Sequence, residues 1–418
     1  MKEKVKLAIV GAGSRGIDSY APHINEGPYN VEVVAVAEPR KIWREKAVSQ
    51  LNIPKENIFL SWKELAEQPR LADGVLITTQ DSMHVGPAIA LMQKGYHVML
   101  EKPMATTEAD CRAIIAAQQE NDCMLAVCHV MRYSRYSQAI KSLISDGVIG
   151  DIKCIQHIEP VGYWHIAHSY VRGNWRREAE SCPMLLAKSC HDLDILRYWV
   201  GQQCLRVSSF GHLSHFSKQN QPEGAADRCL DCPARIESQC PYSAAKIYLR
   251  DRNGNTGWPN NILSNDTSTD GITEALRSGP YGRCVYACDN DVVDHQVINM
   301  DFEGGCTAAF TMCGFTMSGA RETWIMGTRG QLQGNMQEII HMDFLTDKET
   351  VIPIDETGNA ELATGHAGDA TVLLNFIAAI AEGNPAIIKT TPEVSLESHL
   401  IAFAAERARR NNTVEEIL

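Results

Sequence analysis

The sequence predicts an α/β protein with two domains, at residues 1–128 and 129–418. Its length of 418 residues is more than one domain usually holds. In the first part, short apolar stretches alternate with helical ones, which is typical of a mainly parallel sheet with helices on its faces. In the second part, several strands follow one another across short turns, which indicates an antiparallel sheet.

The composition narrows the functional classes. Hydrophobic residues make up 44% of the chain and charged residues 22%, as in ordinary globular proteins. The formal net charge of -12 argues against a nucleic-acid-binding protein, which needs a basic face. Neither a membrane span nor a signal peptide is expected, because no apolar run approaches ~20 residues and the N-terminus leads directly into a strand. Most of the 14 cysteines stand singly in apolar segments, which favours free thiols in a reducing cytoplasm.

The first strand and the helix after it predict a dinucleotide site. The strand Lys4–Val10 runs into a G-x-G-x-x-G motif at the start of a helix. The glycines allow a tight turn and the close approach of a pyrophosphate, which the N-terminus of the helix stabilises. The residues of this motif that we assign to cofactor binding are Gly11, Gly13, Ser14, Arg15 and Gly16.

An acidic residue bears on the choice between NAD and NADP. The strand Val31–Ala37 ends at Glu38, where the ribose 2′-hydroxyl is expected. The carboxylate of Glu38 repels a 2′-phosphate and favours NAD, yet Arg15 and Arg40 are near in the sequence and could bind that phosphate. NAD is therefore the expected cofactor, and NADP stays open.

Two further strand ends contribute candidate site residues. The strand Gly74–Thr78 is followed by Thr79 and by His84, which either caps the next helix or lines the cofactor pocket. The strand His97–Leu100 stops at Glu101-Lys102-Pro103, and ligands bind outside the carboxyl ends of such strands. A solvated lysine is the alternative for Lys102. The remaining elements expected in this domain are helices at 41–51, 62–67 and 107–121 and strands at 58–60 and 124–128.

These features together resemble the glucose–fructose oxidoreductase/inositol dehydrogenase (Gfo/Idh/MocA) family. The resemblance rests on the glycine motif, the acidic end of the second strand, His97–Pro103 and Arg132-Tyr133, and it extends over the whole chain. It implies a Rossmann domain, a C-terminal α/β domain with an open, mostly antiparallel sheet, and a nicotinamide cofactor used mainly on sugars or cyclitols. It also implies that Lys102 is catalytic, with a peptide bond to Pro103 that is often cis, and that Thr79, Glu101 and Arg132 belong to the cofactor site.

The segment 162–177 predicts a substrate-binding loop. Its histidines, aromatic residues and arginines show no apolar periodicity and are poor core material. Aromatic faces stack on sugar rings, and arginines bind carboxylates. A surface loop without such a role is the alternative. The candidate substrate-binding residues are His165, His168, Arg172 and Trp175.

The helix Met184–Val200 carries a second set of polar candidates. Lys188, His191 and Asp192 share one face, as residues i, i+3 and i+4. We assign Lys188 and His191 to catalysis and Asp192 to substrate binding. The family that the chain resembles has an Asp four residues before its active-site histidine, whereas this chain has Ala187. Lys188 could replace that acid by different chemistry, and a structural core histidine is the alternative for His191.

A polar insertion at about 216–290 contains closely spaced cysteines. Such a long irregular segment usually either is stabilised by a cross-link, such as a bound metal, or has a functional role. Cys229 and Cys232 form a C-x2-C pair, Cys240 follows, and Cys284 or Cys288 could supply a fourth ligand. We predict a structural zinc on Cys229, Cys232, Cys240 and Cys284. Free thiols or another kind of metal cluster are the alternatives.

The last third of the chain predicts a sheet and an interface. Strands at 292–302, 306–315, 322–327 and 339–345 suggest an antiparallel meander. Helices cover one face, and the other, if apolar, is expected to form a homodimer or homotetramer. His366 either reaches the substrate or belongs to a capping loop. Helices are expected at 371–382 and 395–410.

The expected function is oxidation of a secondary alcohol of a sugar, cyclitol or glycoside by an NAD(P)-dependent oxidoreductase. The alternative enzyme is a glycoside hydrolase that keeps its NAD bound and cleaves by oxidation and elimination. A cofactor-binding sensor on the same fold is a third interpretation, although Lys102 and His191 argue for catalysis.

Overall fold

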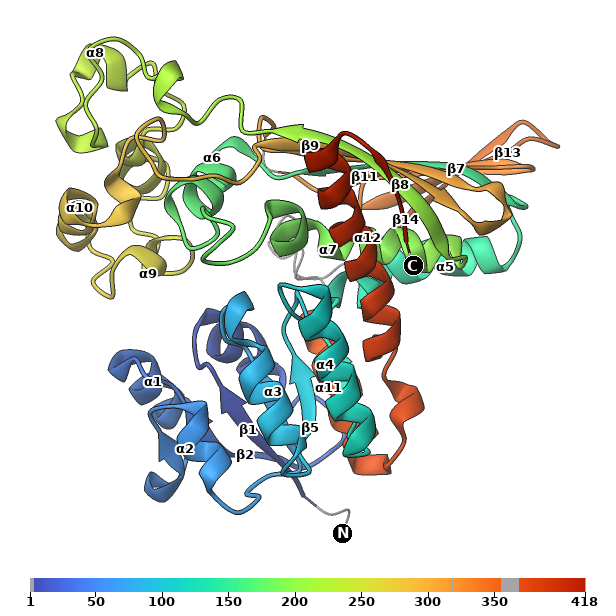
Figure 1. The fold of residues 1–418 in the computed structure, drawn as a ribbon, viewed down its shortest axis with the longest axis horizontal. Helices are drawn as coiled ribbons and strands as arrows, with labels where there is room; N and C mark the ends of the chain where they lie inside the picture. The colour runs from blue at the N-terminus through green and yellow to red at the C-terminus, as the bar shows by residue number, and fades with distance from the viewer. Residues whose placement is uncertain (1–3, 318, 355–367, 418) are drawn as a thin grey trace.

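The N-terminal domain, in the lower half of Figure 1, is built on a parallel sheet. The sheet has six strands in the order β3-β2-β1-β4-β5-β6. The computed structural model describes residues 4–317, 319–354 and 368–417. The strands are β1 (Val5–Val10), β2 (Val31–Ala37), β3 (Ile58–Phe59), β4 (Gly74–Ile77), β5 (His97–Leu100) and β6 (Leu125–Val127). They are short apolar runs because helices cover both faces of the sheet. The order reverses between β1 and β4, which is where ligands bind in such sheets.

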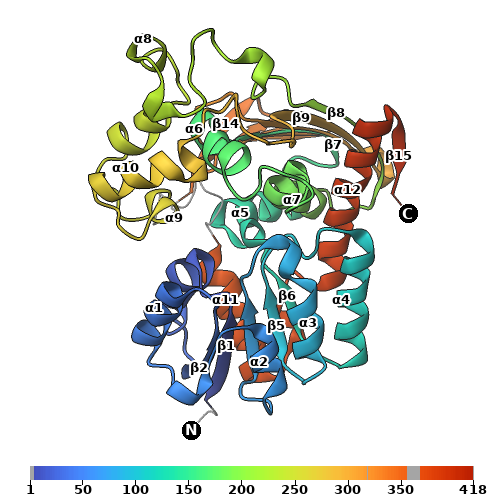
Figure 2. The same cartoon turned by 60° about the vertical axis from the view of Figure 1, so that its left-hand side comes forward.

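One helix on this sheet comes from the far end of the chain. The local helices are α1 (Lys41–Leu51), α2 (Trp62–Glu67), α3 (Val85–Met92) and α4 (Glu108–Glu120). Helix α11 (Asp369–Glu382) contacts β1 and β5, and its Val372 and Phe376 are buried in the core of this domain. The N-terminal domain therefore includes a segment that lies within the range expected for the second domain (Figure 2).

The C-terminal domain contains a nine-stranded sheet in the order β14-β13-β12-β11-β7-β10-β9-β8-β15. Its strands are β7 (Ile152–Pro160), β8 (Cys204–His212), β9 (His295–Phe302), β10 (Thr307–Cys313), β11 (Glu322–Gly327), β12 (Gly330–Gly334), β13 (Glu338–Asp343), β14 (Lys348–Pro353) and β15 (Val414–Glu416). The expected continuous meander is wrong at one point, because β7 pairs with both β10 and β11 and separates them. Only β7 and β10 run parallel among the described strand pairs of this sheet, so it is mostly antiparallel, as expected.

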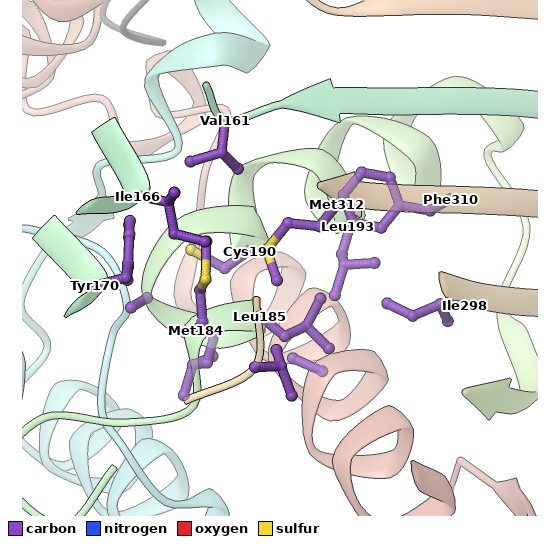
Figure 3. Packing of buried hydrophobic residues seen from close by; sticks show 14 of the residues in the cluster. Val161, Ile166, Tyr170, Met184, Leu185, Cys190, Leu193, Ile298, Phe310 and Met312 are labelled. Carbon is purple, nitrogen blue, oxygen red and sulfur yellow. The ribbon is translucent and has the colours of Figure 1, made fainter. Parts of the chain in front are cut away.

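One face of this sheet is covered and the other is open. Helices α5 (Arg135–Ser145), α7 (Met184–Val200) and α12 (Pro392–Asn411) lie on the same side of the sheet (Figure 1). Inward side chains of β9 and β10 meet α7, as Ile298 and Phe310 do near Leu193 (Figure 3). Alternate residues of the strands point to the open face. The exposed apolar residues there include Phe210, Val297, Trp324 and Val351.

The insertion between β8 and β9 forms a separate lobe at the end of the sheet (Figure 1). It contains short helices, namely α8 (Ala234–Glu237), α9 (Asn260–Leu263) and α10 (Thr269–Ser278). Phe216, Tyr248 and Leu276 are buried within it. The lobe is therefore packed around apolar side chains, although its sequence is mainly polar.

Helix α12 connects the two domains. It packs on α7 and β8 of the second domain and also on α4 and β6 of the first. His399 of this helix accepts a hydrogen bond at Nε2 from the backbone N–H of Met104, at 2.8 Å. This contact holds the segment after β5 against the second domain. It therefore helps to fix the backbone position of Lys102, two residues before Met104. No helix among the described residues is long and apolar enough to cross a membrane.

Candidate active site

The glycine motif forms the expected turn between β1 and a helical segment, Ser14–Tyr20. Gly11 has a φ of +89°, and a Cβ atom there would lie 2.8 Å from the carbonyl carbon of Thr78. A Cβ atom on Gly16 would lie 2.8 Å from the carbonyl oxygen of Gly11. Nearby, the hydroxyl oxygen of Thr79 is buried and has no hydrogen-bond partner in the described part of the chain. A tight backbone turn next to an unpaired hydroxyl fits the pyrophosphate end of a dinucleotide.

Glu38 lies at the end of β2, as expected, and is buried. The guanidinium of Arg40 donates to both of its carboxylate oxygens, at 2.7 and 2.9 Å. Arg40 is itself 57% exposed and extends toward the glycine turn, where its Nη2 lies 3.0 Å from a Cβ position on Gly13. The two charges that bear on cofactor choice therefore pair with each other.

Arg15 is held by two carboxylates. It donates to Glu101 at 2.7 Å and to both oxygens of Asp369, at 2.6 and 2.9 Å. Burial opposes the charge on Arg15, but Asp369 and Glu101 hold its pKa well above the usual value. Burial likewise opposes ionisation of Glu101, but Arg15 and a hydrogen bond from Tyr20 hold the pKa of Glu101 below its usual value. Arg15 thus ties the glycine turn to the end of β5 and to the first turn of α11.

Lys102 reaches across the domain boundary. Its Nζ donates to the backbone carbonyl of Ala187 in α7, at 2.6 Å. The peptide bond between Lys102 and Pro103 is cis, as the resemblance implied. The ring of His84 contacts the carbonyl oxygens of Pro103 and Thr79, at 2.8 and 3.2 Å. His84 therefore braces two strand ends, and its side chain does not cap α3.

Lys188 is buried beside Lys102 and pairs with an acid that sequence analysis missed. Its Nζ lies 3.2 Å from Glu159 at the end of β7. Burial lowers the pKa of Lys188; Glu159 opposes that shift, and the positive charges of Arg321 and Lys102 add to it. Arg321 also binds Glu159, at 2.8 Å. This network places a positive side chain next to Ala187, the position at which the family that the chain resembles has an Asp.

Asp192, which we assigned to substrate binding, is buried in a network of charged side chains. It is 0% exposed and accepts hydrogen bonds from Arg321, while His157 contacts it at 3.2 Å. Burial opposes ionisation of Asp192, but Arg321 and the bonds from both neighbours hold its pKa well below the usual value. Asp192 therefore anchors α7 to the sheet. The inward position of His157 is fixed further by Thr323, at 2.8 Å.

His191 lies at the domain boundary, one turn after Ala187 in α7. Its ring is 6.1 Å from that of His129, centroid to centroid. Arg132, assigned to the cofactor site, is instead in a buried ion pair with Asp194, at 2.8 and 2.6 Å. Arg132 is therefore committed to holding α7 against the segment after β6.

Two of the four loop candidates stay partly exposed. The indole N–H of Trp175 donates to Asp81, which follows β4, at 2.8 Å. His165 stacks on Trp164, with centroids 5.6 Å apart. The link between Trp175 and Asp81 draws this loop toward the cofactor side of the first domain.

The other two loop candidates, His168 and Arg172, are buried against the insertion lobe and have partners there. His168 contacts the hydroxyl of Tyr248 at 2.8 Å, and burial lowers its pKa to about 3. Arg172 is 1% exposed and donates to the carbonyl oxygens of Arg283 and Tyr242, at 2.7 and 2.8 Å. Both side chains find partners within the lobe, a pattern that the loop's lack of periodicity did not reveal.

The expected zinc ligands lie around one cavity of about 30 Å³, and its lining includes Cys229, Cys232, Cys240 and Cys284. All four are free cysteines. Within residues 4–317, 319–354 and 368–417, no group of three or more His, Cys, Asp or Glu side chains has an arrangement that could hold a metal ion. The arrangement of the described side chains therefore does not support the zinc prediction. His366 lies outside the described residues.

Comparison with known families identifies the fold and the type of enzyme. Residues 5–129 match an oxidoreductase family with an NAD-binding Rossmann fold, GFO_IDH_MocA, and residues 141–415 match the C-terminal alpha/beta domain of that family. The chain belongs to the Gfo/Idh/MocA oxidoreductase family. The resemblance, the α/β fold and the oxidoreductase class expected from the sequence are thereby confirmed.

Individual relatives differ in activity. The Bacillus subtilis oxidoreductase YteT is 23% identical over 398 residues, which cover 88% of this chain and 87% of YteT. Inositol 2-dehydrogenase of Pseudomonas fluorescens is 28% identical over 49% of this chain and 56% of its own length. The 2,7-anhydro-N-acetylneuraminate hydratase of Escherichia coli is 28% identical over 50% and 54%. The chain thus matches only about half of the last two relatives.

Solved structures share the fold over the full chain. Scyllo-inositol dehydrogenase from Lactobacillus casei, with bound NAD(H) and scyllo-inositol, aligns with a TM-score of 0.68 and 16% identity, covering 99% of both chains. An Agrobacterium radiobacter oxidoreductase in complex with NAD+, L-tartaric acid and magnesium aligns with a TM-score of 0.71 and 14% identity, covering 99% of both. At these identities the likeness shows the fold.

Proposed function

We propose that this protein oxidises a secondary alcohol of a sugar, cyclitol or glycoside, with NAD as the hydride acceptor. The observation that carries the proposal is the contact of Lys102 with the Ala187 carbonyl, one helical turn before His191. This contact joins the carboxyl end of β5 to the helix that carries His191, which supports a shared role for Lys102 and His191. Relatives named as inositol dehydrogenases support the class of substrate.

The chemistry divides between the cofactor and the protein. When bound, NAD accepts a hydride from the carbon that carries the hydroxyl. Lys102 takes the hydroxyl proton on its amine nitrogen as general base, and its bond to the Ala187 carbonyl directs that nitrogen toward α7. His191 then accepts the proton from Lys102, since imidazole is the side chain best matched to neutral pH. Thr79, Glu38 and the glycine turn hold the dinucleotide.

Lys188 stands next to Ala187, the position of the missing acid, and brings a positive charge to this part of the site. Its ammonium lies 3.2 Å from Glu159, and Lys102 is near enough for its charge to act on Lys188. His165 and Trp175 are the loop residues that we assign to the substrate, because both residues are only partly buried. The link from Trp175 to Asp81 would hold the substrate loop beside the cofactor.

NAD is the proposed cofactor in preference to NADP. Arg15 is already bound by Glu101 and Asp369, so one of the two candidate phosphate ligands is committed elsewhere. Arg40 would have to leave Glu38 to bind a 2′-phosphate, which would place that phosphate beside an unpaired carboxylate.

A screen of sugars, cyclitols and glycosides that measures NADH and free sugar in parallel tests the proposal. NADH formed in step with substrate loss supports net oxidation. A glycoside hydrolase with tightly bound NAD is the second candidate, favoured by the replacement of the family Asp by Ala187 and by relatives named as anhydro-sugar hydratases. Sugar release without net NADH would support that candidate and refute the first.

Structural zinc remains a proposal for the insertion lobe. The four cysteines line one cavity, and the buried guanidinium of Arg172 donates to Cys229 Sγ at 3.4 Å. No ion pair with a carboxylate is formed by Arg172 within the described residues, and a buried cation without a counter-charge is costly. A zinc ion with four thiolates carries a net negative charge that would offset it. Metal analysis of protein purified without added zinc should find about one equivalent per chain; metal-free protein with four reactive thiols would refute the proposal.

We also propose that the open face of the C-terminal sheet is an oligomer interface and that the protein works in the cytoplasm. Exposed Phe210, Val297 and Trp324 lie on that face, next to a hollow of about 600 Å³. A homodimer through this face, or a homotetramer, would cover them. The fourteen free cysteines suit a reducing compartment.

A further inference from the structure

A second imidazole, that of His129, lies next to the ring of His191. His129 follows β6, and its side chain is fully buried. Its ring is 6.1 Å from His191 and 5.5 Å from His399, centroid to centroid, and both pairs are edge-on. His129 thus stands between a residue of the reacting site and the helix that joins the two domains.

His129 is unusual because neither of its ring nitrogens has a hydrogen-bond partner within the described part of the chain. His399 provides the contrast. Its Nδ1 contacts the carbonyl of Ser395 at 2.7 Å, and its Nε2 accepts from Met104 at 2.8 Å. Buried polar groups are nearly always paired, and an unpaired one commonly marks a buried water. The spacing to His191 is too long for a direct bond but leaves room for one bridging water.

The surroundings of His129 favour the neutral form of its ring. Burial lowers its pKa most strongly; Asp194 opposes the shift, while Arg132 and Lys102 add to it and Glu101 opposes it. His191 faces it from α7 and His399 faces it from α12. A neutral imidazole has one N–H donor and one acceptor nitrogen, so each of its tautomers gives a shared water one defined orientation.

We propose that His129 shares a buried water with His191 and thereby fixes which nitrogen of His191 carries the proton and faces Lys102. His129 is a positioning residue, because it acts on the reaction only through His191. The inference rests on the proposed function, which assigns His191 to proton transfer. It goes beyond that function by naming the residue that sets the state of His191.

The test uses nitrogen NMR of the full-length protein labelled with 15N-histidine and bound to NAD, which requires no substrate. The His191 signal is assigned by its loss in His191→Asn. In the unaltered protein His191 should show one dominant tautomer. His129→Leu should give a mixture of tautomers and a shifted titration of His191, whereas His129→Asn, which can still bind the water, should keep the single tautomer.

Turnover supplies the second readout. With the substrate found in the screen, His129→Leu should lower kcat about fivefold, roughly the rate equivalent of one hydrogen bond, and displace the pH profile with little change in KM. His97→Asn, at the opposite end of β5, is the matched control and should alter neither readout. If His129→Leu leaves the tautomer and pH profile of His191 intact and lowers only the melting temperature, the proposal is wrong. If His129→Leu changes the tautomer of His191 but His191→Asn does not affect turnover, the role proposed for His191 is wrong instead.

Discussion

At the scale of single residues, Lys102 carries the most weight in the proposed reaction. Replacement by Met keeps the length and apolar stem of the side chain but removes its amine. Lys102→Met should therefore retain the fold and NAD binding and lose at least ~100-fold in turnover, the low end for a general acid–base group. Lys94→Met, the same change at an exposed position shortly before β5, should keep full activity. Near-normal rates in Lys102→Met would mean that the base lies elsewhere.

Cofactor choice depends on the pair of Glu38 and Arg40. A 2′-phosphate beside Glu38 places like charges within a few ångströms, and a coupling of about 1–3 kcal/mol corresponds to a preference of roughly 5–150-fold for NAD. Fluorescence titration with both cofactors measures this preference. Glu38→Gln should reduce it, because the repulsion is lost, while the neighbouring Lys41→Ala should not. Equal affinity of the unaltered protein for NAD and NADP would show that Arg40 leaves Glu38 readily.

Single residues also show where sequence reasoning succeeds. The positions of Gly11, Glu38 and Lys102 follow from local rules, because each sits at the end of a short buried strand. The partners of Arg132 and Asp192 come from residues far away in the chain, so a local pattern could not separate a ligand-binding charge from a buried ion pair.

At the scale of elements, α7 and β7 form a buried charged layer. Glu159 could have been found from the sequence, since Ile155, His157 and Glu159 alternate along β7 and a charged residue at an inward position requires a partner. Arg321, its partner, lies in a loop and carries no such pattern. The zinc prediction relied on cysteine spacing alone, and spacing does not determine how side chains turn.

Arg321 should matter more for stability than Lys188. Arg321→Met would leave both Glu159 and Asp192 without their shared cation, and loss of one partner of a buried pair typically costs about 3–5 kcal/mol. Lys188→Met leaves Glu159 paired with Arg321, so its free energy of unfolding should fall less, while turnover falls. Arg206→Met, which breaks an exposed pair with Asp301, should cost at most about 1 kcal/mol. Denaturant unfolding measures the free energy of unfolding of the three variants. A different ranking of the three losses would show that the buried charges are not electrostatically linked.

Two buried histidines make the fold sensitive to acid. Burial lowers the pKa of both His168 and His399 to about 3, below the unfolded value of about 6.5. Between these values the unfolded chain binds more protons, so the free energy of unfolding should fall as pH falls from 6.5 toward 3, by up to about 1.4 kcal/mol per pH unit and histidine. Urea unfolding at several pH values measures this slope. The slope should be smaller in His168→Phe, and an unchanged slope would count against this origin.

At the scale of the whole molecule, the two-domain α/β architecture was accessible from the sequence because each half has its own periodicity. Its long-range features were not. Helix α11 returns to the first domain, and β7 lies between β10 and β11. In both cases an apolar face is buried against a segment that is far away in the chain. Local periodicity indicates that a face is buried but does not identify the element that covers it.

The open face of the nine-stranded sheet leads to the last prediction, on assembly. Trp324 is 39% exposed, Val297 37% and Phe210 57%, all on one side of neighbouring or nearby strands. A face of this kind is stable in water when a second copy covers it, because burial of apolar surface favours association. The unaltered protein should therefore sediment as a dimer or larger at micromolar concentration.

Charge placed in that interface should separate the copies. Trp324→Lys combined with Val297→Lys should shift sedimentation to the monomer, because two ammonium groups from each copy would be brought together without partners. The folded state should persist, as both side chains point away from the core. Ile42→Lys, a matched change at a 51% exposed position on α1 of the first domain, should leave the assembly intact. A protein that sediments as a monomer before any change, or a double variant that stays oligomeric, would place the interface elsewhere.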